Sequence, residues 1–302
     1  MRLSSADRLV DAIEHARDVT VLAYTLRPGR VLGAVEDAAR HGARVTVRLE
    51  GIPYRDRGSS LGRINAAATR ELSSLGADVK LVYATPPHRS QLHVKAALVD
   101  GALFLDDVNF TAHANETLLR DYTPSDACMV RSALHELDGA RRSHGAGDDR
   151  RSPQKAVTSG FAVHKSEALA LEAQTLHRAH RGEKIVVETE TMGNRNPVFK
   201  ELDRLGRAGF RPQVLVSNRE LTGNSSERGA LQRLREDGVR IGICKRSEKF
   251  AVVGRCAWIG SANATSLYPS PQQLDWGAKT TSVAIIAYLR ARFAQYWQDA
   301  KT

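Results

Sequence analysis

Long hydrophobic runs are missing from this sequence of 302 residues. No apolar stretch approaches the ~20 residues that a membrane-spanning helix needs, and residues 1–7 lack the apolar core of a signal peptide. Cysteine is scarce as well: Cys128, Cys244 and Cys256 are odd in number and lack metal-site spacing. We therefore expect neither a zinc site nor a disulfide framework, and a cytoplasmic location is the simplest expectation.

Acidic residues are outnumbered by basic ones. The 44 Lys and Arg residues against 34 Asp and Glu give a formal net charge of +10. Such a balance favours polyanionic partners, with nucleic acid first and an anionic phospholipid surface second. An arginine-rich proteome is the alternative explanation of the same charge. The apolar content of 42% is ordinary for a globular protein long enough for one large domain or two smaller ones.

Helical and strand patterns alternate along the chain, which predicts an α/β layer architecture. In the first half, helices are expected at 6–16, 31–41 and 61–75, and strands at 19–24, 43–49 and 78–83. Residues 138–155 are small or charged and lack periodicity, which is typical of an exposed linker. The same order then begins again, with helices at 166–180, 197–208 and 228–237 and strands at 184–190, 211–217 and 239–243.

One motif stands out in the first half: His93-x-Lys95-x4-Asp100, followed by Asn109. The apolar residues around it predict a buried strand. Because side chains alternate along a strand, His93 and Lys95 should point to the same face. An imidazole beside a fixed cation is a layout suited to phosphoryl chemistry.

The motif has a counterpart 154 residues later. His93, Lys95, Asp100, Asn109 and Asp121 correspond in turn to Ser247, Lys249, Gly254, Asn263 and Asp275. Five correspondences at one offset indicate an internal duplication.

These motifs, together with Gly260-Ser261-Ala262-Asn263, resemble the HKD signature of the phospholipase D superfamily. The resemblance covers nearly the whole chain. It implies two tandem α/β repeats, each a mixed β-sheet flanked by helices, packed as a pseudo-dimer with the active site in the cleft between them. The expected boundaries are 1–140 for the first repeat, 141–156 for the linker and 157–302 for the second repeat. No cofactor is implied. We expect a monomer with pseudo-two-fold symmetry, and a homodimer that unites two complete motifs is the variant.

In the family, one histidine attacks phosphorus and the other protonates the leaving oxygen. This chain departs from that pattern, since Ser247 and Gly254 replace the second His and Asp, and Asp106-Asp107 replaces a Gly-Ser pair. The resemblance therefore implies a single nucleophile, His93. Two phosphate-binding lysines, Lys95 and Lys249, complete the expected asymmetric site.

The remaining roles follow from the same resemblance. The amides of Asn109 and Asn263 would neutralise charge that grows on the phosphate oxygens. Asp275 would orient His93 from the opposite repeat, as in a catalytic triad. Asp121 and Asp107 are then candidates for the missing acid. The weaker candidates are Asp100, which is more typical of a structural turn residue, together with Ser247 and Ser261.

The favoured function is a metal-independent phosphodiesterase that forms a phosphohistidine, with nucleic acid as substrate. One alternative is a phospholipid headgroup hydrolase or phosphatidyltransferase. The polar loops at 51–60 and 221–228 count against it, because a lipid site needs an apolar rim. The other alternative is an inactive nucleic-acid-binding module.

Overall fold

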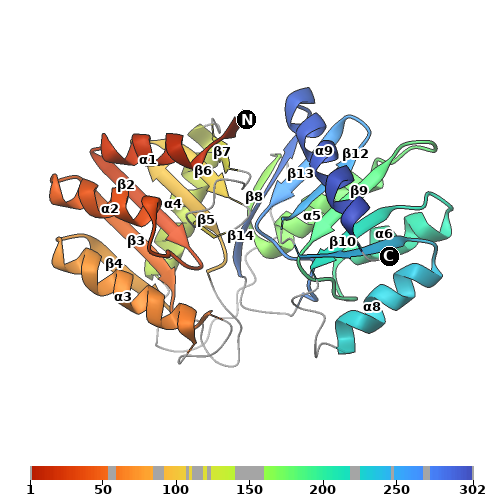
Figure 1. Cartoon of the computed structure of the whole chain (residues 1–302), viewed down its shortest axis with the longest axis horizontal. Coiled ribbons are helices and arrows are strands. Elements are labelled where there is room, and N and C mark those ends of the chain that lie inside the picture. Colours follow the sequence, from red (N-terminus) through yellow and green to blue (C-terminus); the bar gives the residue numbers. More distant parts are fainter. Residues whose placement is uncertain are drawn as a thin grey trace.

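The computed structural model consists of two seven-stranded sheets that stand side by side with helices packed against them (Figure 1). It describes residues 2–53, 59–83, 92–106, 109–110, 118–120, 124–139, 160–217, 225–245, 248–267 and 273–300. No helix within these ranges is long and apolar enough to cross a membrane. The expected linker at 141–156 lies outside them, so the repeat boundaries stay a prediction.

The first sheet and its helices occupy the first half of the chain. Their elements are β1 (Arg2–Ser4), α1 (Ala6–Glu14), β2 (Asp18–Ala23), α2 (Arg30–Arg40), β3 (Arg44–Glu50), α3 (Ser60–Ser74), β4 (Asp78–Val82), β5 (Lys95–Val99), β6 (Ala102–Asp106), β7 (Leu118–Arg120) and α4 (Pro124–Gly139). The strand of the histidine motif thus begins at Lys95, and His93 lies just before it.

The second sheet and its helices follow in the same order. Their elements are β8 (Phe161–His164), α5 (Lys165–His177), β9 (Ile185–Thr189), α6 (Pro197–Arg207), β10 (Gln213–Ser217), α8 (Ser225–Glu236), β11 (Arg240–Cys244), β12 (Phe250–Val253), β13 (Cys256–Gly260), β14 (Leu274–Thr280) and α9 (Val283–Asp299).

The two sheets have the same strand order. The first runs β1-β7-β6-β5-β2-β3-β4, and the second, read from its β8 edge, runs β8-β14-β13-β12-β9-β10-β11. In each sheet three strands are parallel, because helices connect them, and the hairpin strands that follow are antiparallel. The expectation of two α/β repeats with mixed sheets is therefore confirmed.

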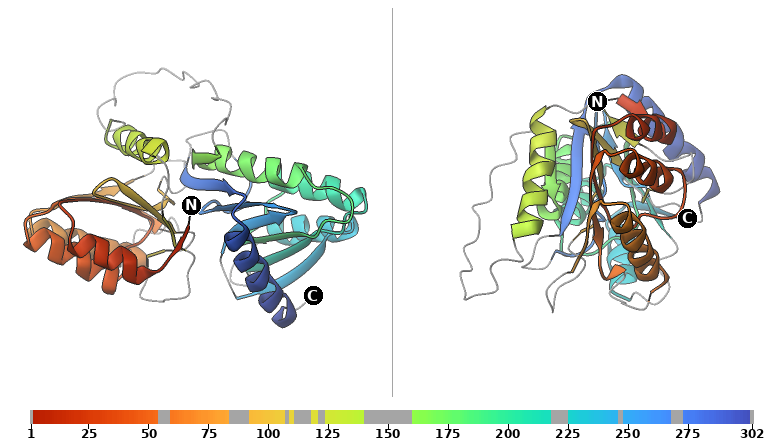
Figure 2. Two further views of the ribbon diagram at one scale, coloured as in Figure 1. Left: turned by 90° about the horizontal axis from the view of Figure 1, so that it is seen from above. Right: turned by 90° about the vertical axis from the view of Figure 1, so that its left-hand side faces the viewer.

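Helices cover both faces of each sheet (Figure 2). One apolar cluster packs α1, α2 and α3 onto the first sheet, and a second packs α5, α6 and α8 onto the second sheet. A third cluster contains residues of both repeats, among them Leu92 and Leu105 from the first and Phe250 and Trp276 from the second. The repeats thus share a continuous hydrophobic core, as the pseudo-dimer expectation requires.

The turn after β5 explains one departure from the expected motif. Asp100 and Gly101 both have positive φ, and the Asp100 carboxylate accepts hydrogen bonds from the backbone N–H groups of Arg17 and Asp18 at 3.0 and 2.9 Å. The counterpart Gly254 also has positive φ, and a Cβ there would lie 2.1 Å from a carboxylate oxygen of Glu183. Glycine therefore fits this turn in the second repeat as it stands, whereas a larger residue would have to displace the Glu183 carboxylate.

A buried carboxyl group limits the stability of the second repeat. Glu172 on α5 is only 1% exposed, and its Oε1 has no hydrogen-bond partner. Burial raises the pKa of Glu172 well above its ordinary value of 4.5. The unfolded chain therefore loses this proton first as the pH rises. The free energy of unfolding falls from about pH 4.5 upward until the pH passes the folded-state pKa.

We predict that Glu172→Leu raises the free energy of unfolding at pH 7.5 by about 1–3 kcal/mol, because it removes an unsatisfied buried polar group. Denaturant titrations at pH 5 and pH 7.5 measure the effect, which should be larger at pH 7.5. Glu167→Gln, on the same helix but partly exposed, is the control and should change stability by about 0.5 kcal/mol or less. A Glu172→Leu protein less stable than wild type at pH 7.5 would contradict this reading.

Candidate active site

The candidate site lies where the two repeats are joined by direct hydrogen bonds. The backbone N–H of His93 donates to the carbonyl of Leu274 at 2.9 Å, and the indole N–H of Trp276 donates to the carbonyl of Asp106 at 2.8 Å. These bonds connect the start of β5 and the end of β6 to β14. They hold side chains of both repeats at fixed relative positions.

His93 and Asp275 meet across this junction. Nδ1 of His93 is 2.8 Å from Oδ1 of Asp275, a residue that is fully buried. Ser261 Oγ donates to the same oxygen at 2.8 Å and accepts from the backbone N–H of Trp276 at 3.0 Å. With a proton on Nδ1 donated to Asp275, Nε2 of a neutral imidazole keeps its lone pair for attack on an electrophile.

The electrostatics of the pair keep the imidazole neutral. Burial and the neighbouring Lys95 ammonium lower the pKa of His93 to about 4, against the opposing effect of Asp275. Burial raises the pKa of Asp275, but the interactions with His93 and the charges of Lys165 and Lys95 together outweigh it, so the pKa is lowered overall. Above pH 4 the histidine is therefore uncharged and the carboxylate is ionised.

Lys95 is the cation beside the histidine. It is 2% exposed, and its Nζ lies 3.1 Å from Nε2 of His93. The Tyr24 ring meets the imidazole edge-on, with 5.1 Å between the ring centroids. Burial lowers the pKa of Lys95 to about 7, and the charge of Lys249 adds to this effect. The lysine is thus charged below pH 7 and loses that charge as the pH rises further.

The second repeat adds a cation, an amide and a carboxylate. Lys249 is 2% exposed, and its Nζ lies 3.6 Å from Oε2 of Glu190. The Asn263 side chain donates to the same oxygen at 3.1 Å. Burial raises the pKa of Glu190, but the Lys249 charge and the Asn263 hydrogen bond outweigh it, so the pKa is lowered overall. Both candidate phosphate ligands of this repeat are therefore engaged by a carboxylate.

Glu190 has no place in the histidine motif and is not among the site residues expected from the sequence. It directly follows β9, as Tyr24 directly follows β2. An alignment of the two repeats by their strands, and not by the motif alone, would have found it.

Of the other expected site residues, the structure describes the asparagines and Asp100, and three acidic or serine residues lie outside it. Asn109 lies just before Phe110, and its Oδ1 is buried without a hydrogen-bond partner, as is Oδ1 of Asn263. Asp100 lies at the far end of β5, about 16 Å along the strand from Lys95 at 3.3 Å per residue, where it serves the turn. Asp121, Asp107 and Ser247 lie outside the described residues, so their roles stay predictions.

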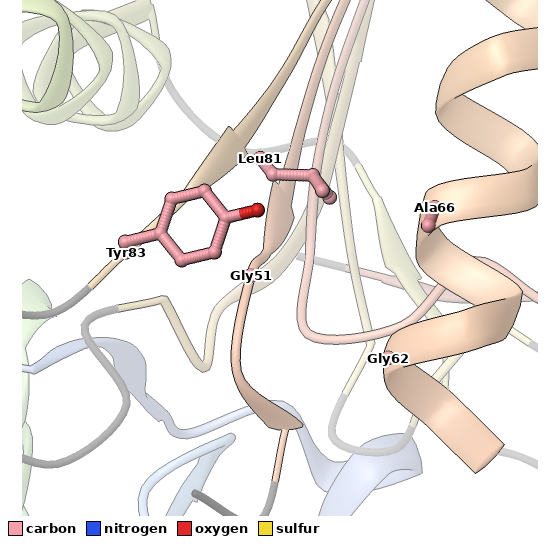
Figure 3. A pocket seen from close by; sticks show the side chains of 5 residues that line it. All are labelled: Gly51, Gly62, Ala66, Leu81 and Tyr83. Carbon is pink, nitrogen blue, oxygen red and sulfur yellow. The ribbon is translucent and has the colours of Figure 1, made fainter. Parts of the chain in front are cut away.

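A separate pocket of about 380 Å³ lies between the ends of β3 and β4 and the start of α3 (Figure 3). Its lining consists of Gly51, Gly62, Ala66, Leu81 and Tyr83. Among these described lining residues, the tyrosine phenol is the sole ionisable group. Within the described part of the chain, no cluster of three or more His, Cys, Asp or Glu side chains is placed to hold a metal ion.

Comparison with known proteins rests on structure alone, since no family model and no curated protein matches the sequence. The chain superposes on phosphatidylserine synthase of Haemophilus influenzae with a TM-score of 0.66 and 10% sequence identity, over 100% of this chain and 89% of that one. It superposes on polyphosphate kinase of Porphyromonas gingivalis with a TM-score of 0.60 and 14% identity, over 96% of this chain. It covers 49% of the kinase, so it spans about half of that enzyme's length.

Both neighbours are phosphoryl-transfer enzymes of the phospholipase D superfamily. The chain has the phospholipase D fold. The resemblance of its motifs to this superfamily is thus confirmed at the level of the fold, and the duplicated architecture accounts for the match over the whole chain.

The geometry predicts how His93 titrates. Its imidazole should stay neutral, with the proton on Nδ1, from pH 8 down to about pH 5, and should gain a second proton only near pH 4. Ring ¹⁵N chemical shifts followed by NMR measure both the tautomer and the pKa. In Asp275→Asn the carboxylate that raises the pKa is lost, so the pKa should fall further. A His93 that titrates near 6.5 in wild type would contradict the buried arrangement.

Proposed function

We propose that this protein cleaves phosphodiesters through a covalent phosphohistidine at His93, without a metal ion. The observation that carries the proposal is the hydrogen bond between His93 and Asp275 across the repeats. It leaves Nε2 as the nucleophilic nitrogen and places a buried negative charge where the imidazole becomes positive during attack.

Two lysines supply the positive charge that a phosphoryl group needs. Lys95 in the first repeat and Lys249 in the second are buried near the imidazole, and the charge of each affects the pKa of His93. As the substrate phosphate enters, Lys95 turns from the imidazole to a non-bridging oxygen. The two ammonium groups then stabilise the charge that grows on the phosphate oxygens. Between pH 4 and pH 7, the imidazole is neutral and Lys95 is charged, which is the state that attack requires.

The reaction has two steps. In the first, Nε2 of His93 attacks phosphorus and the bond from phosphorus to the leaving oxygen breaks. In the second, water or an alcohol attacks phosphorus and the bond to Nε2 breaks, which restores the histidine. The Nδ1 proton stays with His93 throughout, because Asp275 holds it in place.

Nucleic acid is the substrate class we favour. The chain carries a net charge of +10, which attracts a polyanion and raises its local concentration. A second candidate is transfer of a phospholipid headgroup to an alcohol. The match to phosphatidylserine synthase over the whole length of this chain supports that alternative.

The proposal predicts an adduct that depends on one residue. Wild-type protein mixed with bis(p-nitrophenyl) phosphate and quenched without acid should gain the mass of one nitrophenyl phosphoryl group, and His93→Ala should gain none. Intact-protein mass spectrometry measures the adduct, and peptide mapping locates it. Turnover of single-stranded DNA against a phosphatidyl lipid with an acceptor alcohol then separates the two substrate classes. No adduct, no nitrophenol and no turnover of either substrate would favour an inactive binding module instead.

A further inference from the structure

The second repeat has no histidine with which to protonate a leaving group, because Ser247 stands at the position that corresponds to His93. Among the described acidic residues, Glu190 contacts both the cation and the amide of the second repeat. Of the other acidic groups near the site, Asp275 is already bonded to His93, and Asp106, whose charge acts on Lys95, belongs to the first repeat.

The pseudo-symmetry fixes the position of Glu190. In the first repeat, Ala23 of β2 pairs with Lys95, so Tyr24 follows at the end of the strand. In the second repeat, Glu188 of β9 pairs with Phe250, which places Thr189 opposite Lys249 and makes Glu190 the counterpart of Tyr24.

The bridges beyond the strands agree with this register. Leu26, two residues after Tyr24, bridges to Phe110, while Met192, two residues after Glu190, bridges to Ala264. Phe110 and Ala264 are themselves 154 residues apart, which is the offset of the repeat.

Tyr24 is the residue whose ring touches His93. Glu190 is therefore the residue of the second repeat that corresponds to the neighbour of the nucleophile in the first repeat. Glu190 belongs to the same phosphate site, since its Oε2 contacts Lys249 and Asn263 and the charge of Lys95 also acts on it.

We propose that Glu190 is the general acid and base of the reaction and replaces the missing second histidine. This role rests on the phosphodiesterase function proposed above. When the substrate phosphate binds, its oxygens contact the Lys249 ammonium in place of Glu190. The bound phosphate also adds a negative charge close to the Glu190 carboxylate. Both changes favour the protonated form of Glu190, so substrate binding itself produces the proton donor.

The protons balance over the two steps. As Nε2 of His93 bonds to phosphorus, the bond to the leaving alkoxide breaks, and the Glu190 carboxylic acid gives its proton to that oxygen. In the second step the Glu190 carboxylate takes a proton from the attacking water or alcohol as its oxygen bonds to phosphorus and the bond to Nε2 breaks. Glu190, ionised in the free enzyme, takes one proton from solvent as the substrate binds. It is protonated again at the end of the second step, and His93 is again neutral. When the product leaves and Lys249 returns to Glu190, that proton goes back to solvent.

Leaving groups of different acidity test this role. p-Nitrophenolate leaves without a proton, whereas the alkoxide of a nucleotide needs one. We expect Glu190→Gln to release about one equivalent of nitrophenolate from thymidine 5′-(p-nitrophenyl phosphate) in a burst whose rate is within about threefold of wild type. Steady-state release should then slow, because the second step lacks its base. Single-turnover cleavage of a thymidine dinucleotide should fall by about 10²–10⁴-fold.

Three variants complete the experiment. Glu190→Asp keeps a carboxylate and should recover part of the dinucleotide cleavage. Glu236→Gln changes an exposed carboxylate on α8 and should match wild type on both substrates. His93→Ala should abolish the burst, and wild type without any nitrophenolate release would refute the phosphodiesterase function itself.

The results that would overturn the role of Glu190 differ from the result that would refute the phosphodiesterase function. If wild type releases nitrophenolate and Glu190→Gln loses both activities by the same factor, Glu190 serves only to position Lys249. If Glu190→Gln keeps both activities, another group is the acid.

Discussion

The hydrogen bond between His93 and Asp275 is the contact on which the rest of this structure depends. Its two residues are 182 positions apart in the sequence and come from different repeats. The parallel bridge of Leu92 to Leu274 and the bond from Trp276 to Asp106 place β14 against the start of β5. The shared core between the sheets keeps them there. The duplicated fold is thus the means by which a carboxylate of one repeat reaches a histidine of the other.

Burial of the charged groups in the site lowers the stability of the folded protein. Lys95, Lys249 and Asp275 are almost completely buried, and removing charged groups from water is unfavourable even where they form pairs. In the described part of the site, the ammonium groups of Lys95 and Lys249 are stabilised by the carboxylates of Asp275, Glu190 and Asp106. A phosphodiester brings one negative charge into this balance. The arrangement therefore suits a ligand that displaces the Glu190 contact better than it suits an empty site.

Much of this arrangement follows from the sequence, because the two motifs occur at one offset. The pairing of His93 with Lys95 on one strand face, the mixed sheets and the contact of the repeats all follow from local periodicity and the duplication. The motif does not reveal the role of Asp100. An aspartate can act in catalysis, but this one has positive φ and accepts a hydrogen bond that stabilises a turn. Glu190 shows another limit. Its position depends on the register of β9 against β12, a long-range pairing that no local pattern encodes.

The central claim is that one phosphoryl site is assembled from both repeats, with His93 as its nucleophile. A crystal structure with orthovanadate, which adopts the geometry of a phosphoryl transition state, tests it most directly. The account predicts vanadium bonded to Nε2 of His93, with vanadate oxygens in contact with Nζ of both Lys95 and Lys249. Vanadate that binds to one repeat alone, or that leaves Nε2 of His93 unbonded, would contradict it.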